Sequence, residues 1–279
     1  MVLALLHPFV QLSWVKWSIH PSTVIGIFAL AAIYILRARQ VPPGEQPPGA
    51  ARKFSFFAGL FLMFACLNGP LHDLSDDYLF SAHMVQHLLL TLAMPPMLIY
   101  GVSGWMLRPL LANRFLGPIA RKITKPAWCF TIFNLSIAVW HLPFFYNAAM
   151  ANHNIHIVEH LIFMASAVLM WWPLTSQLPE LPRLPYPGQV LYCFMMSIPM
   201  SVVAVYITMA DHILYPAYSS APRIFPLSPM DDQMLGGLIM WIPGTLIFTI
   251  ILSIVFFKWS ARGEDDSAGA QVDWKPKTA

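Results

Sequence analysis

Long apolar segments alternate with short polar connections along the whole chain. A helix that spans a membrane needs about 20 consecutive, mostly apolar residues. Seven segments approach or meet this length: residues 20–36, 54–70, 80–100, 127–146, 154–173, 187–210 and 234–257. The pattern predicts an all-α polytopic membrane protein with seven transmembrane helices, and it leaves no room for a soluble catalytic domain.

The ends of the chain differ in character from this central region. Residues 1–19 are apolar but short, and they lack the basic start and small-residue cleavage site of a signal peptide. We therefore predict an interfacial N-terminal segment anchored by Trp14 and Trp17. Residues 20–259 form the predicted transmembrane domain, and the polar residues 260–279 are predicted to be a disordered cytoplasmic tail.

The positively charged residues predict the orientation in the membrane, because short loops rich in Lys and Arg stay in the cytoplasm. Alternate connections between the predicted spans contain nearly all of them: Arg37, Arg39, Arg52, Lys53, Arg108, Arg114, Arg121, Lys122, Lys125, Arg183, Lys258, Arg262, Lys275 and Lys277. Only Lys16 and Arg223 fall on the other side. The N-terminus is therefore predicted outside and the C-terminus inside.

The composition excludes several classes of protein. Hydrophobic residues make up 57% of the chain and charged residues 10%, the mean hydropathy is +0.60, and the formal net charge is only +3. These values argue against a disordered chain, a nucleic-acid-binding domain and a water-soluble enzyme. The chain has no nucleotide-binding loop, catalytic Ser/His/Asp elbow or HExxH motif, so we predict that it is not an enzyme.

All ten histidines fall at or near the predicted outer ends of the spans. The same side has seven Asp and Glu residues, so it combines imidazoles with negative charge and is expected to attract cations. A general depletion of Lys and Arg from outer loops would explain the missing positive charge. It would not explain why the histidines lie on one side.

Two histidine motifs have the spacing of a metal site. In HMVQH, His83 and His87 are four residues apart and share one helical face. In HNIHIVEH, His156 and His160 have the same spacing, whereas Glu159 is expected to lie off to the side. Paired imidazoles bind transition metals, and ionisable residues inside a membrane are costly and usually functional. His141, in WHLP, is either a ligand or a hydrogen-bonded core residue.

Acidic residues next to the predicted third and seventh spans allow two interpretations. His72, Asp73, Asp76 and Asp77 can receive a metal ion before it enters the bundle, or the acids can cap the start of a helix. The same alternatives hold for Asp231 and Asp232, which are followed by Gln233. Most of the 16 methionines are interpreted as packing residues. The exceptions, close to the outer histidines, are Met84, Met230 and Met234.

Several long motifs resemble the caa3-type cytochrome c oxidase assembly factor family, the Bacillus-type CtaG proteins. They are NGPLHDLSDDYLFSAHMVQHLLLTLAMPP, WHLPFFYNAAM, HIVEHLIFMASAVLMWWPL, LYPAY and SPMDDQMLGGLIMWIPG, and the similarity runs from about Trp17 to Trp259. The resemblance implies seven spans in the bacterial plasma membrane and a role in maturing haem-copper oxidases. Transferred by position, the family pattern emphasises these residues: His72, Asp73, His83, His87, His141, His156, His160, Asp231 and Gln233.

Together these arguments predict Cu(I) binding by His83, His87, His156 and His160, with His141 as a further ligand or a supporting group. The site is expected toward the periplasmic or extracellular side, with oxidase subunits, copper and the lipid bilayer as partners. Two alternatives remain open. Paired histidines on facing helices can hold a haem iron, and a metal transporter would use the outer cluster as its mouth.

Overall fold

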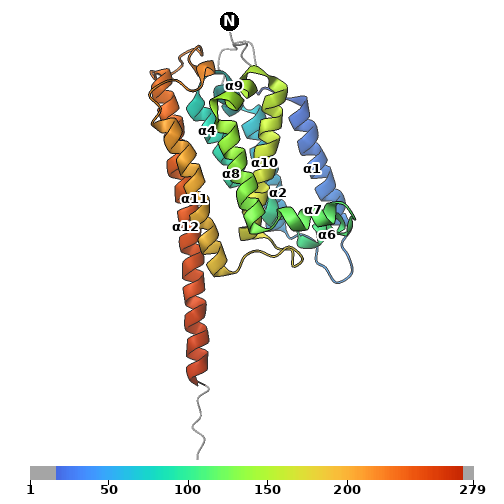
Figure 1. Ribbon diagram of the computed structural model, residues 1–279. Coiled ribbons are helices and arrows are strands. Elements are labelled where there is room, and N and C mark those ends of the chain that lie inside the picture. Colours follow the sequence, from blue (N-terminus) through green and yellow to red (C-terminus); the bar gives the residue numbers. More distant parts are fainter. Residues whose placement is uncertain (1–16, 273–279) are drawn as a thin grey trace, which may run out of the picture.

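A computed structural model describes residues 17–272, with the backbone alone for residues 263–272. Every regular element in this range is helical, which confirms the all-α prediction (Figure 1). The elements are α1 (Pro21–Arg39), α2 (Ala50–Asn68), α3 (Pro70–Asp77), α4 (Phe80–Leu88), η1 (Leu89–Ala93), α5 (Met94–Gly101), α6 (Gly104–Ala112), α7 (Leu116–Ile123), α8 (Pro126–His141), α9 (Pro143–Ala151), α10 (His153–Thr175), α11 (Tyr186–Thr208), η2 (Pro216–Tyr218) and α12 (Pro229–Val272).

Six helical segments of the described chain are long and apolar enough to cross a membrane. They are α1, α2, the continuous α4–η1–α5 segment, α10, α11 and the part of α12 up to Arg262. A seventh span results if the bent pair α8–α9 is counted as one. The prediction of a polytopic membrane protein is confirmed, and the side on which each terminus lies stays a prediction.

The fourth predicted span, residues 127–146, is wrong as a single helix. Helix α8 ends at His141, and α9 begins at Pro143 with a bend of 73°. Pro143 has no N–H to continue the hydrogen-bond ladder, and it restricts the residue before it to an extended conformation. Leu142 accordingly has φ −65° and ψ 134°. The bend turns α9 across one end of the bundle (Figure 1).

The predicted terminal segments are described only in part. Residues 1–16, including Trp14, lie outside the described residues. Trp17 stacks on Phe64 of α2, with ring centroids 5.4 Å apart. Residues 260–272 of the predicted tail continue α12 as a helix, and residues 273–279 lie outside the described part.

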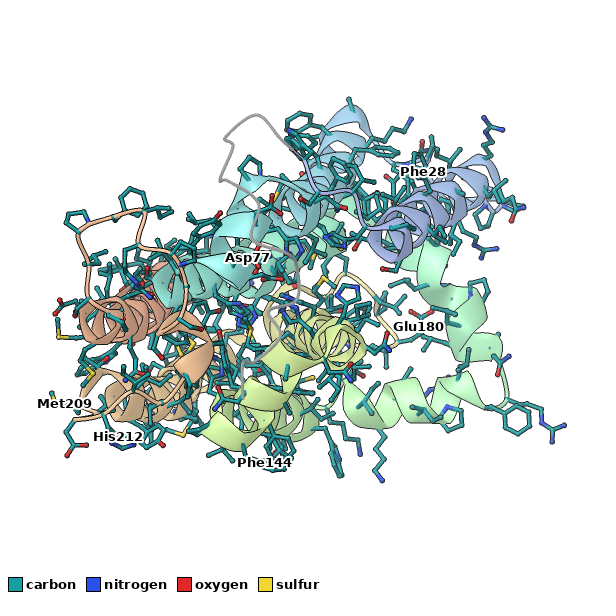
Figure 2. All side chains as sticks on the ribbon, turned by 90° about the horizontal axis from the view of Figure 1, so that it is seen from above. Phe28, Asp77, Phe144, Glu180, Met209 and His212 are labelled. Atoms are coloured by element: carbon teal, nitrogen blue, oxygen red, sulfur yellow. The ribbon has the colours of Figure 1, made fainter. Side chains whose placement is uncertain are left out.

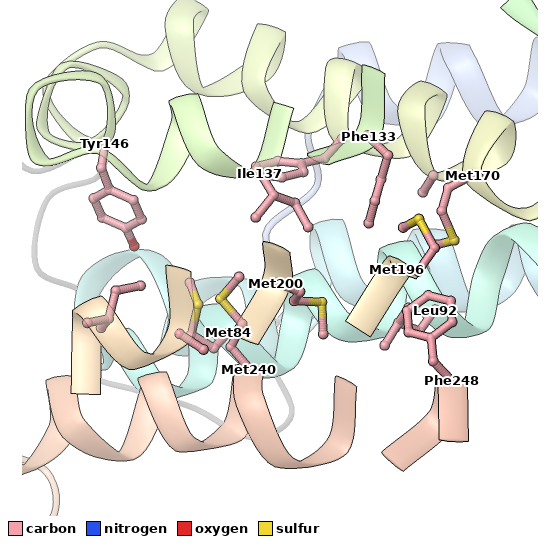
Figure 3. Packing of buried hydrophobic residues seen from close by; sticks show 14 of the residues in the cluster. Met84, Leu92, Phe133, Ile137, Tyr146, Met170, Met196, Met200, Met240 and Phe248 are labelled. Atoms are coloured by element: carbon pink, nitrogen blue, oxygen red, sulfur yellow. The ribbon is translucent and has the colours of Figure 1, made fainter. Parts of the chain in front are cut away.

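The main core lies among α4, α8, α10, α11 and α12, and it is rich in methionine (Figure 3). A second core joins α1, α2 and α5. There Tyr34 stacks on Phe56 with centroids 3.9 Å apart. Gly101 allows α5 to approach α2, since a Cβ at this position would lie 2.5 Å from the Cβ of Phe56. Helix α1 is the least buried of the candidate spans.

The third span contains one wide turn, the π-helical segment η1. Pro95 and Pro96 follow it and cannot donate backbone hydrogen bonds, which leaves carbonyl groups of the preceding turn free. The indole Nε1 of Trp171 on α10 donates to the carbonyl of Thr91, at 2.9 Å. This hydrogen bond satisfies the Thr91 carbonyl, which would accept from the N–H of residue 95 if that residue were not proline. It also links η1 to α10.

One end of the bundle gathers the histidines, and we call it the histidine end. There α2, α8 and α11 finish, while α4, α10 and α12 begin (Figure 1). The short helix α3 also lies at this end, packed against α2 and α4. In the view along the bundle, Asp77 of α3 lies well inside the outline, whereas Phe144 and His212 lie at its margin (Figure 2).

Candidate metal centre

Three helices bring buried acidic and imidazole groups together at the histidine end. We call this set the acid–histidine cluster: Asp76 of α3, His83 and His87 of α4, and His156, Glu159 and His160 of α10. Each of these residues is at most 6% exposed. The two histidine pairs face one another because a spacing of four residues places each pair on one side of its helix. The ring centroids of His87 and His160 are 5.3 Å apart.

Asp76 lies at the centre of three imidazoles. Its carboxylate oxygens are 3.4 Å from Nδ1 of His156, 3.6 Å from Nδ1 of His72 and 3.9 Å from Nδ1 of His83. The Ser75 hydroxyl donates to Asp76 Oδ1 at 3.0 Å. Burial would raise the pKa of Asp76, but the surrounding imidazoles outweigh it and hold the pKa below its ordinary value. Asp76 is therefore a buried anion aimed at nitrogen ligands.

The ligand atoms are close enough to share an ion. Asp76, His83 and His156 form one group of three whose ligand atoms lie within 4.8 Å of one another, and His83, His87 and Glu159 form another. Nε2 of His156 and Nε2 of His160 are 2.9 Å apart. Two nitrogens bound to one ion at about 2.0 Å lie roughly 2.8–3.3 Å apart, depending on the angle at the metal. The observed separation fits this range.

Several of these atoms have no hydrogen-bond partner among the described residues. They are both ring nitrogens of His83, both ring nitrogens of His87 and both carboxylate oxygens of Glu159. Buried polar atoms are nearly always hydrogen-bonded, because losing water without a partner costs about 1–3 kcal/mol per group. A cluster of such atoms on one face is the pattern expected of an ion site.

Glu159 is the main site residue that the sequence interpretation misplaced. It was expected to lie off to the side, yet it is 1% exposed and belongs to the group with His83 and His87. The spacing contained the signal, because His156, Glu159 and His160 are related by three and four residues and so share a helical face.

Gln86 is a second residue that the motif analysis passed over. Its amide donates to the Cys66 carbonyl at 2.7 Å, accepts from Ser75 Oγ at 2.9 Å and lies 3.4 Å from Nδ1 of His72. Gln86 thus links α2, α3 and α4 next to the acid–histidine cluster, because its partner Ser75 also bonds Asp76. The sequence offered one indication of this role, because Gln86 is a polar residue inside an otherwise apolar span, three positions after His83.

The other acids near α3 surround the cluster. Asp73 accepts a hydrogen bond from Ser18 Oγ at 2.9 Å. Asp77 is 3% exposed, and burial together with the charges of Asp76 and Asp73 raises its pKa to about 7. The structure therefore places Asp73 and Asp77 beside Asp76, as the sequence order requires, but it does not include them in either group of three.

Asp231, Asp232 and Gln233 hold helix ends and loops. Asp232 is fully buried and accepts hydrogen bonds from the backbone N–H groups that begin α4, 2.8 Å from Phe80 N and 3.1 Å from Ser81 N. Gln233 accepts from Leu214 N and donates to the carbonyl of His212. Asp231 is exposed and accepts from Ser228 Oγ. None of the three belongs to the groups of potential ligands found among the described residues.

His141 and Met84 lie on the core side of the cluster. The rings of His141 and His87 have centroids 6.0 Å apart. Both residues line a small cavity together with Met84, which is 1% exposed. Of the other two methionines highlighted beside the histidines, Met230 is half-buried and Met234 is 44% exposed, and neither lines this cavity.

A larger cavity of about 600 Å³ opens between α1 and α10. Its walls are mostly apolar, and five histidines line it: His20, His72, His153, His156 and His160. No Lys or Arg of the described chain lines it. The acid–histidine cluster is therefore bordered by the small cavity on the core side and by an apolar space on the side of α1.

The chain is similar to one protein family over most of its length. Residues 27–262 match the family model of the cytochrome c oxidase caa3 assembly factor. No curated protein and no solved structure shows significant similarity to the chain. The family match spans all the helices that contribute to the acid–histidine cluster.

Proposed function

Because the chain belongs to the cytochrome c oxidase caa3 assembly factor family, we propose that it helps to mature the oxidase by binding copper in the acid–histidine cluster and releasing it to an oxidase subunit. The observation that carries this proposal is the buried group of Asp76, His83 and His156, whose ligand atoms lie within 4.8 Å of one another. Copper is the cargo in this proposal, and the protein performs no chemical conversion.

The donor set favours copper over the hard cations. Imidazole nitrogen suits copper and zinc, whereas calcium and magnesium take oxygen ligands. Among divalent ions, copper binds a given nitrogen and oxygen site more tightly than its neighbours in the series. The cluster contains two buried acids, Asp76 and Glu159. The carboxylate of Asp76 alone would offset the charge of a monovalent ion.

Each residue has a proposed role. His83 and His156, which both contact Asp76, are the first ligands, and His160 and His87 complete the shell. His72, Asp73 and Asp77 attract the ion toward the cluster. The side chains of Asp232 and Gln233 are already engaged by backbone groups, so we leave them, with the exposed Asp231, outside the proposed site.

The cavity beside α1 supports haem as a second candidate ligand. Its volume of about 600 Å³ lies in the range of small-molecule sites, and imidazoles line it. Against haem, the described residues of its wall include no Lys or Arg to pair with the haem carboxylates. Copper therefore remains the preferred cargo, and an absorption band in the Soret region of the purified protein would reverse this preference.

Metal binding by the full chain tests the proposal directly. The protein is purified in mild detergent, loaded with Cu(I) without oxygen, and the bound copper per chain is measured. The double variant His83→Ala/His156→Ala is expected to lose the copper of the cluster and to lower the copper content and activity of the oxidase in cells. The matched control is His212→Ala, because the side chain of His212 is 71% exposed and outside the cluster. Unchanged copper binding and full oxidase activity in the double variant would overturn the proposal.

A further inference from the structure

A small cavity lies on the core side of the acid–histidine cluster, among α4, α8, α11 and α12. Its volume is about 20 Å³, slightly more than one water-sized sphere needs. We call its imidazole and thioether residues the deep pocket: Met84, His87, His141, Met200 and Met240. All five are at most 6% exposed. Thr91 also lines the cavity, and its hydroxyl donates to the carbonyl of His87.

The hydrogen bonding of His141 fixes which of its nitrogens faces a ligand. Nδ1 of His141 lies 2.8 Å from the backbone carbonyl of Ile137, which can only accept, so Nδ1 carries the proton. Nε2 then presents a lone pair, and it is buried without a hydrogen-bond partner among the described residues. Histidines that bind metals commonly have this arrangement, with one ring N–H held by a carbonyl and the other nitrogen on the ion.

His87 is positioned to share an ion with His141. Their ring centroids are 6.0 Å apart. A nitrogen–metal bond of about 2.0 Å places a ring centroid about 3.1 Å from the ion, so two rings that share one ion are at most about 6.2 Å apart. Neither nitrogen of His87 has a hydrogen bond within the described chain. The geometry therefore suits one ion between the two rings.

The remaining polarisable groups around the cavity are thioethers from three helices. Met84 of α4, Met200 of α11 and Met240 of α12 come together in the core (Figure 3). Buried methionine usually fills space, but here the three side chains leave a void beside two imidazoles. Thioether sulfur is a soft ligand that selects Cu(I).

The position of Met200 depends on a glycine of the neighbouring helix. A Cβ added at Gly244 would lie 1.5 Å from the terminal methyl carbon of Met200. Any side chain at position 244 would therefore displace the thioether. Gly244 gives the experiment a way to move one sulfur without removing it.

We propose that the deep pocket is a second copper site, selective for Cu(I) and formed by the imidazoles of His87 and His141 with the thioethers of Met84, Met200 and Met240. It deepens the proposed function, on which it rests for its cargo. His87 is shared with the acid–histidine cluster, and it lies about 6 Å along α4 from His83. When both sites are filled, His87 binds the ion of the deep pocket, and Asp76, His83, His156 and His160 hold the ion of the cluster. An ion can pass between the sites by exchange of ligands, without a change of oxidation state.

The test measures two quantities in the full chain: the number of copper ions bound per chain and the presence of copper–sulfur bonds. The purified protein is loaded with Cu(I) without oxygen, and X-ray absorption at the copper edge reports sulfur neighbours. We expect two copper ions per chain and a clear sulfur contribution. The variant Met84→Leu/Met200→Leu/Met240→Leu, which keeps approximate volume, is expected to bind one copper and to lose the sulfur contribution.

The matched control removes three other buried methionines, Met63→Leu/Met94→Leu/Met170→Leu, which do not line the deep pocket. It is expected to keep both ions and the sulfur contribution. The variant Gly244→Ala keeps every ligand and is expected to weaken the sulfur contribution by displacing Met200.

Three results would overturn the inference, and they differ in what they say about the proposed function. One copper per chain bound only by nitrogen and oxygen, and lost in His83→Ala/His156→Ala, would remove the deep pocket and leave the acid–histidine cluster standing. No bound copper in the wild-type protein would remove both. Retention of two ions and the sulfur signal in the variant of the pocket methionines would likewise exclude the deep pocket.

Discussion

Asp232 offers the sharpest test of whether an acid at the histidine end supports the fold or binds metal. Helix α4 has no side-chain cap of its own, since the side chain of Leu79 at its N-cap position has no atom that accepts a hydrogen bond. Asp232, from α12, accepts instead from Phe80 N, Ser81 N and Ser81 Oγ, at 2.8, 3.1 and 2.5 Å. We predict that Asp232→Ala destabilises the apo-protein.

The magnitude follows from the groups that lose their partner. Two buried backbone N–H groups would be left unsatisfied, at roughly 1–3 kcal/mol each. The negative charge at the start of the helix contributes a further 0.3–1 kcal/mol or so. Partial entry of water reduces the total, so we expect a loss of about 2–5 kcal/mol. In Asp232→Asn the amide oxygen still accepts one of these bonds, and the expected loss is about half as large.

The assay is thermal unfolding in detergent, with copper removed by a chelator. We expect the midpoint to fall most in Asp232→Ala and less in Asp232→Asn. In Asp231→Ala it should hardly change, because Asp231 is exposed and bonded only to nearby Ser228. A change below about 0.5 kcal/mol in Asp232→Ala, the usual range for surface substitutions, would refute the capping argument. So would a destabilisation that occurs only when copper is present.

Three further predictions concern contacts around the site. Gln86→Leu removes the hydrogen bonds to Ser75 and Cys66. It should weaken copper binding about 10–100-fold, as loss of residues that support metal ligands typically does, and an unchanged copper affinity would contradict this. Trp171→Phe removes the donor to the Thr91 carbonyl and should lower the free energy of unfolding by about 1–3 kcal/mol, measured by thermal unfolding. The comparison is Trp172→Phe, because the indole of Trp172 donates to a loop carbonyl instead. Tyr146 and Tyr218 share a hydrogen bond of 2.8 Å, so a double-mutant cycle with phenylalanine should give a coupling of about 0.5–1.5 kcal/mol; additive effects would show that the bond contributes nothing.

The spans were predictable because each is a long apolar run. A run of that length crosses a membrane as a helix, since a helix satisfies its own backbone hydrogen bonds. The break at Leu142–Pro143 was not recognised, although the proline was visible, because apolar residues continue on both sides of it. The short helix α3 was not predicted, because its residues are mostly polar and lie between two apolar spans.

The histidine pairs were predictable from spacing alone, since residues four apart share a helical face wherever the helix packs. Contacts between distant segments were not. The sequence around Asp232 fits a metal ligand and a helix cap equally well. Only the packing of α12 against α4 brings its carboxylate to the backbone N–H groups of Phe80 and Ser81. Nothing in the spacing of Met200 and Met240 indicates a metal ligand, and they meet only because α11 and α12 pack along their length.

The wide turn η1 allows the third span to lose one residue without rotating its two halves against each other. An α-helix turns about 100° and rises 1.5 Å per residue, whereas a π-helical turn holds one residue more. The five residues of η1 therefore turn the chain through nearly the same angle as four residues of ordinary α-helix. Deleting one residue from 89–93 would convert the turn into ordinary helix and would leave His83 and His87 facing α10 and α5 facing α2. A deletion between His83 and His87 has no wide turn to absorb it, so a gap in an alignment at that place, and not at η1, would separate proteins that build this site from proteins that do not.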